Sequence, residues 1–166
     1  SYLINMGHRN IVFIGGSEAS YDSIQRKNGF IDAMKDSNIS LRENQIITGF
    51  YEKSGGYNAT KSYLRENPSK VPDAILAAND LSAMGSIEAL KSEGIDVPND
   101  VSVMGFDDIE IAKYYLPKLT TVANPISRQG VVSVQELIQL IKEDDKGKAH
   151  KLKGEIIVRD STSVFS

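Results

Sequence analysis

A repeated alternation of short apolar runs with longer amphipathic stretches constrains the fold of this chain more than any other feature. The apolar runs predict strands at Ile11–Ile14, Gln45–Thr48, Ala74–Ala78, Val101–Phe106, Leu119–Ala123 and Gly154–Arg159. Apolar residues at helical spacing predict helices over Tyr21–Ser37, from Ser54 to before Pro68, from Asp80 to Gly94 and over Ile126–Lys142. Such alternation requires right-handed crossovers. We therefore predict an α/β fold, a doubly wound parallel sheet with helices on both faces.

In a parallel sheet the loops that follow the strands leave at one edge, and the loops of this chain are polar. The loops after the first four predicted strands are Ser17–Arg26, Phe50–Lys53, Asn79-Asp80 and Asp107-Asp108. Ligands of open α/β sheets bind outside the carboxyl ends of the strands. The topology therefore predicts that these four segments converge on one crevice.

The acidic and amide residues of these loops have two interpretations each. Asn79 and Asp80 can cap the helix that follows them, contact a ligand, or do both. Asp107 can cap a short helical segment, with Asp108 favouring the dipole of its first turn. Two acids exceed what capping needs, so we expect one of them to contact a ligand.

Arg26 and Tyr51 are equally open. Arg26 lies in the first turns of a predicted helix, where a positive charge gains nothing from the helix dipole. It is either a solvated surface residue or a donor that points into the crevice. Tyr51 either packs on its own loop or offers a flat face to a sugar or a base.

Composition excludes several classes of function. A chain of 166 residues can bury one full core, and it contains no cysteine, so a disulfide framework and thiolate chemistry are excluded. The net charge is −3 and the basic residues are scattered among acids, so we expect no nucleic-acid contact by this stretch. The apolar runs are too short to span a bilayer.

The motifs of common enzymes are missing. Gly15-Gly16 lacks the spacing of dinucleotide and phosphate loops, and both histidines, His8 and His150, lie outside the crevice loops. We therefore predict a protein that is not an enzyme, with no catalytic residues, no metal site and no cofactor.

Several runs of residues together resemble a known family. GHRNIVFIGG, ANDLSAMG, VPNDVSVMGFDD and LTTV, in that order and spacing, resemble the lactose-repressor and galactose-repressor family of bacterial transcription regulators. The resemblance implies a two-lobed, periplasmic-binding-protein-like sensor. Residues 1–122 and 152–166 are then its C-terminal lobe, and residues 123–151 an excursion belonging to the N-terminal lobe. The DNA-binding headpiece is expected to be absent from this chain.

The resemblance also implies an effector site and its chemistry. Arg26, Asn79 and Asp107 match the family's polar clamp on the effector, and Tyr51 falls where an aromatic residue often stacks on it. Asp22 and Ser20 belong to the variable loop after the first strand. In purine-responsive members a basic residue stands where this chain has Ser20, so the resemblance favours a mono- or disaccharide as the effector.

A homodimer is the assembly that the resemblance implies. The family dimerises partly through the helix that begins near Asp80 and the segment before LTTV, which makes interface candidates of Met84, Ile87, Tyr114 and Tyr115. Operator DNA would be contacted only through the headpiece of a cytoplasmic regulator. An exported sugar-binding receptor of a transport system is the alternative with the same fold. We expect the apolar stripe of Ile126–Lys142 to fold back onto the sheet or to pair with another copy.

Overall fold

The computed structural model describes residues 1–143 and 147–165, with the side chain of residue 143 outside the description. Residues 144–146 and 166, which belong to the predicted excursion and the predicted C-terminal lobe, lie outside the described residues. The helices are α1 (Tyr2–Asn5), α2 (Tyr21–Asp36), α3 (Lys53–Glu66), α4 (Asp80–Ser92) and α5 (Ile126–Glu143), with short 3-10 turns η1 (Glu43–Gln45) and η2 (Glu110–Lys113). The strands are β1 (Ile11–Gly15), β2 (Ile46–Thr48), β3 (Ala74–Ala77), β4 (Ser102–Met104), β5 (Thr121–Ala123) and β6 (Glu155–Ile157).

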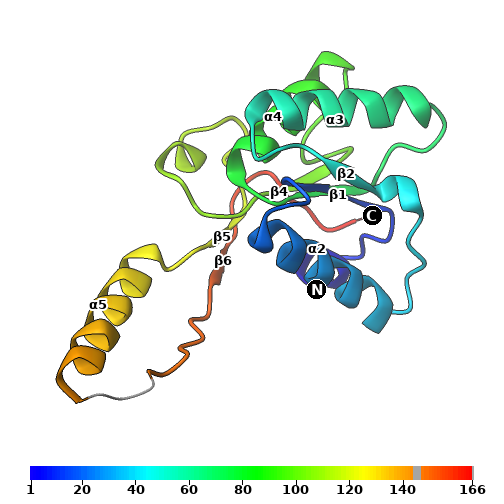
Figure 1. Ribbon diagram of the computed structural model, residues 1–166. Helices are drawn as coiled ribbons and strands as arrows, with labels where there is room; N and C mark the ends of the chain where they lie inside the picture. Colours follow the sequence, from blue (N-terminus) through cyan, green and yellow to red (C-terminus); the bar gives the residue numbers. More distant parts are fainter. Residues whose placement is uncertain (144–146, 166) are drawn as a thin grey trace.

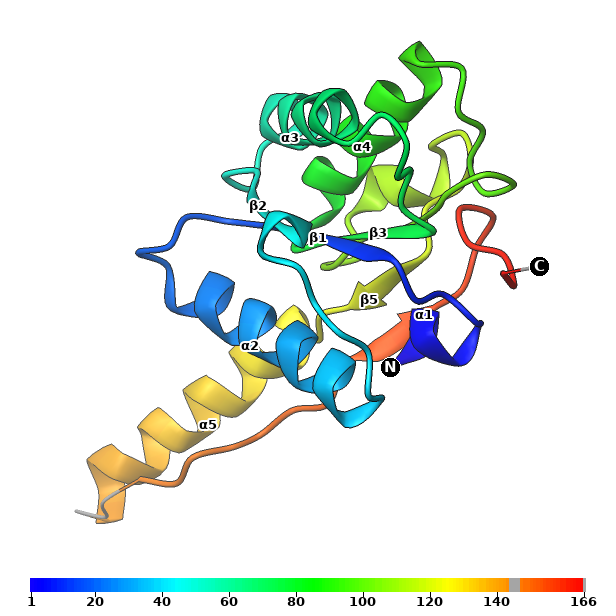
Figure 2. The same cartoon turned by 90° about the vertical axis from the view of Figure 1, so that its right-hand side faces the viewer.

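The main sheet is parallel, with strand order β2-β1-β3-β4. Helices α3 and α4 cover one face, and α1 and α2 lie against the other (Figures 1 and 2). All residues of β1 are buried, as expected for a strand covered on both faces. The predicted fold class, a doubly wound parallel sheet with helices on both faces, is confirmed.

The fifth and sixth predicted strands form a separate pair. β5 and β6 are antiparallel to each other, and Thr121 stands opposite Ile157. Single parallel bridges, Met104 with Thr120 and Asp107 with Ala123, join the start and end of the β5 segment to the edge of the main sheet. The pair therefore leads from the main sheet towards α5 (Figure 1).

Helix α5 does not fold back onto the sheet, so this part of the prediction is wrong. It extends away from the sheet in both views (Figures 1 and 2). Its apolar stripe is exposed to solvent, at Val131, Val134, Leu137, Ile138 and Ile141. The returning chain contacts α5 at His150, whose Nε2 lies 2.8 Å from a carboxylate oxygen of Glu136. The alternative that α5 pairs with another copy stays a prediction.

Two glycines allow α3 and α4 to pack backbone against backbone. A Cβ atom on Gly85 would lie 1.9 Å from the carbonyl oxygen of Lys53, and one on Gly56 would lie 2.1 Å from that of Ser82. Any side chain at either position would therefore push the two helices apart. Met84 and Ile87, on another face of α4, are buried in the core cluster that also contains Val12 and Ile75 of the sheet.

We expect Gly85→Ala to destabilise the chain by about 1–3 kcal/mol, because the added methyl group has no space between α3 and α4. Gly29→Ala is the matched control, since a Cβ at this position of α2 meets no atom within 4 Å. The control should stabilise the chain by about 0.5–1 kcal/mol through helix propensity alone. Urea unfolding followed by circular dichroism measures both, and equal effects of the two substitutions would contradict the packing described.

Candidate functional site

The loops after the strands meet at one edge of the sheet, and Arg26 lies at the centre of their contacts. Its guanidinium donates through Nη1 to the carbonyl oxygen of Ala78, and Nη2 lies 3.4 Å from Oδ1 of Asp107. The side chains of Arg26 and Asp107 are 19% and 25% exposed, so the ion pair is partly shielded from water. Arg26 is therefore not a solvated surface residue, and its role as a donor to a ligand stays a prediction.

Aromatic rings flank this guanidinium. Its Cζ lies 4.0 Å from the ring centroid of Phe106 and 5.8 Å from that of Tyr51. A cation over an aromatic face is attracted by the ring quadrupole. Phe106, which the sequence assigned to a strand without a functional role, therefore helps to hold Arg26 in place.

Asn79 joins two of the loops. Its side-chain oxygen accepts a hydrogen bond from the backbone N–H of Ser82 at 2.9 Å, so it caps α4 as the sequence suggested. Its Nδ2 donates to the carbonyl oxygen of Tyr51 at 2.8 Å. Most of the hydrogen-bonding capacity of Asn79 is thus used within the protein, and one N–H remains for a ligand.

Tyr51 lies in a tight turn at the same edge. The φ angles of Phe50 and Tyr51 are 55° and 63°, in the left-handed region that residues with a Cβ rarely adopt. The ring lies so close to Gly16 that a Cβ there would be 2.0 Å from Cε2 of the tyrosine. The Tyr51 hydroxyl is buried and has no hydrogen-bond partner among the described residues. The ring packs against Gly16 and lies beside Arg26, and its stacking on an effector stays a prediction.

The two consecutive acids point in different directions. Asp107 and Asp108 have φ angles of 106° and 54°, and the backbone turn sends one side chain towards Arg26 and the other towards Arg159. Oδ1 of Asp108 lies 2.6 Å from Nη2 of Arg159. Burial raises the pKa of Asp107 above its ordinary value of 3.8, and the charge of Arg26 opposes this shift. Of the two acids, Asp107 is the one that pairs with Arg26, and its contact with a ligand stays a prediction.

Asp80 is a third carboxylate behind the crevice, and it is only 1% exposed. Its Oδ2 accepts the backbone N–H of Ile109 at 2.8 Å, and its Oδ1 accepts the hydroxyl of Thr121 at 2.5 Å. Burial raises the pKa of Asp80 from 3.8 to about 6, although both hydrogen bonds lower it in part. Asp80 therefore joins α4, the loop after Asp108 and strand β5, and it does not reach the crevice surface.

Ser20 and Asp22 lie at the exposed start of α2. Ser20 is the residue that precedes the helix, and its side chain makes no capping hydrogen bond. Asp22 is exposed, and its negative charge contributes to the raised pKa of Asp107. Neither joins the hydrogen bonds around Arg26, and their part in an effector site stays a prediction.

The predicted interface residues fall into two groups. Met84 and Ile87 are each 2% exposed and belong to the main hydrophobic core, so their assignment to an interface is wrong. Their apolar spacing on α4 serves the core cluster that α4 forms with the main sheet. The Tyr115 hydroxyl donates to the carbonyl oxygen of Met84 and to Oε1 of Glu88, at 3.2 and 3.0 Å. Tyr114 is 73% exposed, and its interface role stays a prediction.

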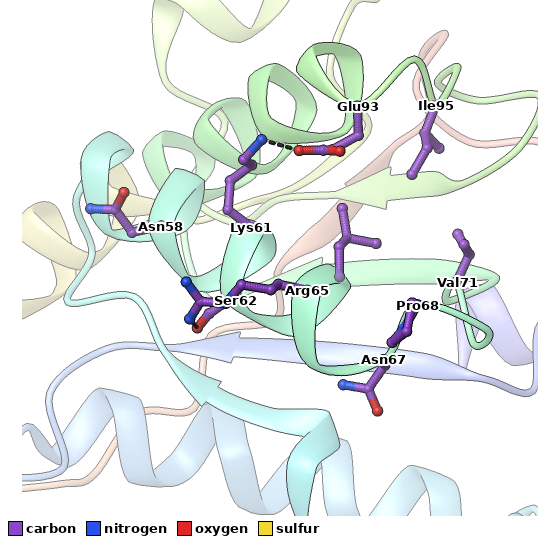
Figure 3. Close-up of a pocket in the computed structure, with 10 residues that line it drawn as sticks. Asn58, Lys61, Ser62, Arg65, Asn67, Pro68, Val71, Glu93 and Ile95 are labelled. Atoms are coloured by element: carbon purple, nitrogen blue, oxygen red, sulfur yellow. Dashed lines mark hydrogen bonds and ion pairs between the residues drawn. The ribbon is translucent and has the colours of Figure 1, made fainter.

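A groove on the surface lies away from this site. It has a volume of about 740 Å³ and runs between α3, the end of α4 and the segments that lead into β3 and β4. Figure 3 shows Lys61 of α3 paired with Glu93 at this groove, whose lining also includes the apolar side chains of Ile95 and Val71. None of the predicted effector residues lines this groove.

Arg26 also closes one end of an apolar cavity of about 320 Å³. Side chains of α1, α2, the main sheet and the β5–β6 pair form its walls, among them Phe30, Met104 and Ile156. The apolar surroundings lower the local dielectric constant, which strengthens the attraction between Arg26 and Asp107.

The structure also bears on metal binding and on membrane-spanning helices. Within residues 1–143 and 147–165, no group of three or more His, Cys, Asp or Glu side chains could hold a metal ion. Over the same ranges, no helix is both long enough and apolar enough to cross a membrane.

Comparison with known proteins identifies close relatives. The family model of the periplasmic binding protein-like domain matches residues 1–162. The HTH-type transcriptional repressor PurR of Histophilus somni strain 129Pt is 35% identical over 167 residues, which is 99% of this chain and 49% of the relative. The chain thus spans about half the length of the relatives that it matches.

Solved structures agree with this match. The lac repressor dimer bound to operator and the anti-inducer ONPF superimposes with a TM-score of 0.91 at 29% identity, over 98% of this chain and 55% of the repressor. The complex of the transcriptional regulator CelR with cellobiose gives a TM-score of 0.89 at 28% identity, over 96% of this chain and 49% of the regulator.

The buried carboxyl of Asp80 predicts a pH dependence of stability. Its pKa in the folded chain, about 6, lies above the ordinary value of 3.8, so protonation favours the folded state. This contribution is full below about pH 4 and is lost as the pH rises through about 6. We expect Asp80 to stabilise the chain by roughly 1 kcal/mol more at about pH 5 than at about pH 7.

The measurement compares urea unfolding of the wild type and Asp80→Asn at both pH values. The difference between their unfolding free energies should shift in favour of the wild type on acidification, because the amide carries no titrating charge. Asp32→Asn, which changes an exposed carboxyl on α2, is the control and should show no such shift. A constant difference between wild type and Asp80→Asn would contradict the prediction.

Proposed function

Since the chain belongs to the LacI/GalR family of transcriptional regulators and corresponds to part of its effector-binding domain, we propose that it senses a sugar and thereby controls operator binding. The whole protein would be a cytoplasmic homodimer that contacts DNA through a separate helix-turn-helix headpiece. Effector binding would change the angle between two lobes and so the spacing of the two headpieces.

The observation that carries the proposal is the Arg26–Asp107 pair beside two aromatic rings. A carboxylate accepts hydrogen bonds from adjacent hydroxyl groups, and a guanidinium donates to hydroxyl or ring oxygens. An aromatic ring covers the apolar face of a sugar ring. The relative CelR is described in complex with cellobiose, which supports a mono- or disaccharide. Ser20 brings no positive charge to the entrance, where the family's purine-responsive members have a basic residue.

The site residues would have different roles in effector binding. Asp107 and Arg26 would contact the effector directly, and Tyr51 would cover one face of it. Asn79 would offer its remaining N–H, while Ser20 and Asp22 would act at the entrance as determinants of selectivity.

The division into lobes is part of the same proposal. Residues 1–122 and 152–166 would form the C-terminal lobe, and 123–151 would belong to the N-terminal lobe, with β5 and β6 crossing between them. The exposed stripe of α5, which includes Val131, Val134 and Ile138, supports this division because it has the character of a face that packs in a core.

Half of a cleft should bind its effector weakly. Micromolar affinity requires about 8 kcal/mol. Three charge-assisted hydrogen bonds contribute roughly 1.5–3 kcal/mol each, against an association cost of at least about 4 kcal/mol. We expect the 166-residue chain to bind a sugar at millimolar strength or more weakly, and the whole regulator to bind it far more tightly. Submicromolar binding by this chain, measured by calorimetry, would contradict the two-lobed site.

The class of effector is tested by titrating the whole regulator with cellobiose, galactose, glucuronate and adenine. We expect binding of a sugar, and Asp107→Asn should weaken it about 10- to 100-fold because a charged acceptor is lost. Asp32→Asn, a matched change of an exposed carboxyl, should leave the affinity unchanged. Binding of adenine alone would overturn the sugar assignment.

The dimer is tested at Tyr114, which is exposed together with Ile111 and Leu116 on the segment before β5. Tyr114→Asp should raise the dimer dissociation constant at least about tenfold, because it places an unpaired charge in an apolar contact. Tyr21→Asp is the control, since Tyr21 is also 73% exposed but lies at the start of α2. Sedimentation that gives the same dissociation constant for both variants would exclude Tyr114 from the interface.

A further inference from the structure

We propose that Arg159 is a positioning residue for the effector-binding loop. Its ion pair with Asp108 holds the backbone turn that directs Asp107 towards Arg26, and it joins this loop to the strands that lead to α5. The effect of Arg159 on effector binding rests on the proposed function, whereas its positioning of the turn rests on the geometry of the ion pair alone.

The turn at the two acids needs something to hold it. Asp107 and Asp108 both have positive φ angles, 106° and 54°, which cost free energy for residues with a Cβ. Such a conformation persists only where surrounding contacts impose it. If the turn relaxed, the side chain of Asp107 would no longer point towards Arg26.

The guanidinium of Arg159 joins Asp108 to the segment that leads into β5. Nη2 lies 2.6 Å from Oδ1 of Asp108, and Nη1 donates to the carbonyl oxygen of Leu119 at 2.8 Å. The side chains of Arg159 and Asp108 are 12% and 22% exposed, so water and salt screen their attraction only in part. The backbone N–H of Arg159 donates to the Thr120 hydroxyl at 2.9 Å, which fixes the start of this side chain as well.

The same contacts connect the effector loop to the β5–β6 pair. Arg159 follows the end of β6 at Ile157, and Leu119 precedes the start of β5 at Thr121. The backbone N–H of Asp107 donates to the carbonyl oxygen of Val122 in β5 at 2.9 Å. A rotation of β5 and β6 relative to the main sheet would therefore move Asp108 through Arg159, and Asp107 with it.

This arrangement gives the consecutive acids separate tasks. Asp107 faces the crevice, whereas Asp108 is the attachment point of the connecting strands. Effector binding at Asp107 and movement of β5 and β6 would thus both act on this short turn. The free energy by which effector binding shifts the position of the strands would equal the free energy by which the position of the strands changes effector binding.

Hydrogen exchange of the whole regulator tests the positioning role without any effector. In Arg159→Met, which keeps the length of the side chain but removes its charge, amide exchange in residues 105–109 should rise about tenfold or more, with exchange in α3 and α4 unchanged. Adding Asp108→Asn should bring no further increase, and Arg159→Lys should restore part of the protection. Lys61→Met, which removes the surface ion pair with Glu93, is the control and should leave residues 105–109 unaffected.

The second measurement is the affinity of the same variants for the cellobiose probe, or for the sugar that the titration identifies. Arg159→Met should weaken binding about tenfold and Arg159→Lys should weaken it less, although the side chain at position 159 does not contact the effector. Unchanged exchange in residues 105–109, or an equal rise over the whole chain, would overturn the proposal. Failure of every sugar to bind would overturn only the proposed function, because the exchange result decides the positioning role by itself.

Discussion

The parallel pairing of β1, β3 and β4 is the constraint on which the rest of the structure depends. It brings the carboxyl ends of the strands to one edge, so that Arg26, Tyr51, Asn79 and Asp107 lie together although up to 81 positions separate them in the sequence. The strands are short, and their side chains pack on both faces. The sheet is therefore a rigid base, and the polar residues follow it in the loops, where their charges can meet a ligand.

Two carboxylates that do not pair with Arg26, those of Asp80 and Asp108, hold the loops of the site in place. Asp80 is buried behind the crevice and binds Ile109 and Thr121, and Asp108 binds Arg159. Burying Asp80 costs free energy that its hydrogen bonds offset only in part, and Arg159 offsets the cost of partly burying Asp108. Such groups restrict the loop to one conformation, because any other arrangement would leave a buried charge without its partners. The position of Asp107 is a product of these contacts as much as of its own pairing.

The sequence predicted the features that depend on periodicity and order along the chain. It predicted the parallel sheet, the converging loops and Asn79 as a helix cap, because these follow from local patterns and handed crossovers. Helical spacing placed Met84 and Ile87 on an inward face, and it was the family resemblance that assigned them to a dimer interface, although both are buried in the core of the chain. The sequence did not identify Arg159, whose partner Asp108 lies 51 positions earlier and meets it only in the folded chain. Long-range pairing of this kind leaves no local signal.

The exposed stripe of α5 and the half-open crevice have one common explanation. α5 lies beyond the β5–β6 pair and lacks a surface to cover its apolar side chains, whereas Arg26 and Asp107 lie on the main-sheet side of the pair and remain partly exposed. A second lobe would complete the two together. Because the connecting strands are tied to the effector loop through Asp108, the burial of α5 in that lobe and the position of Asp107 would not be independent.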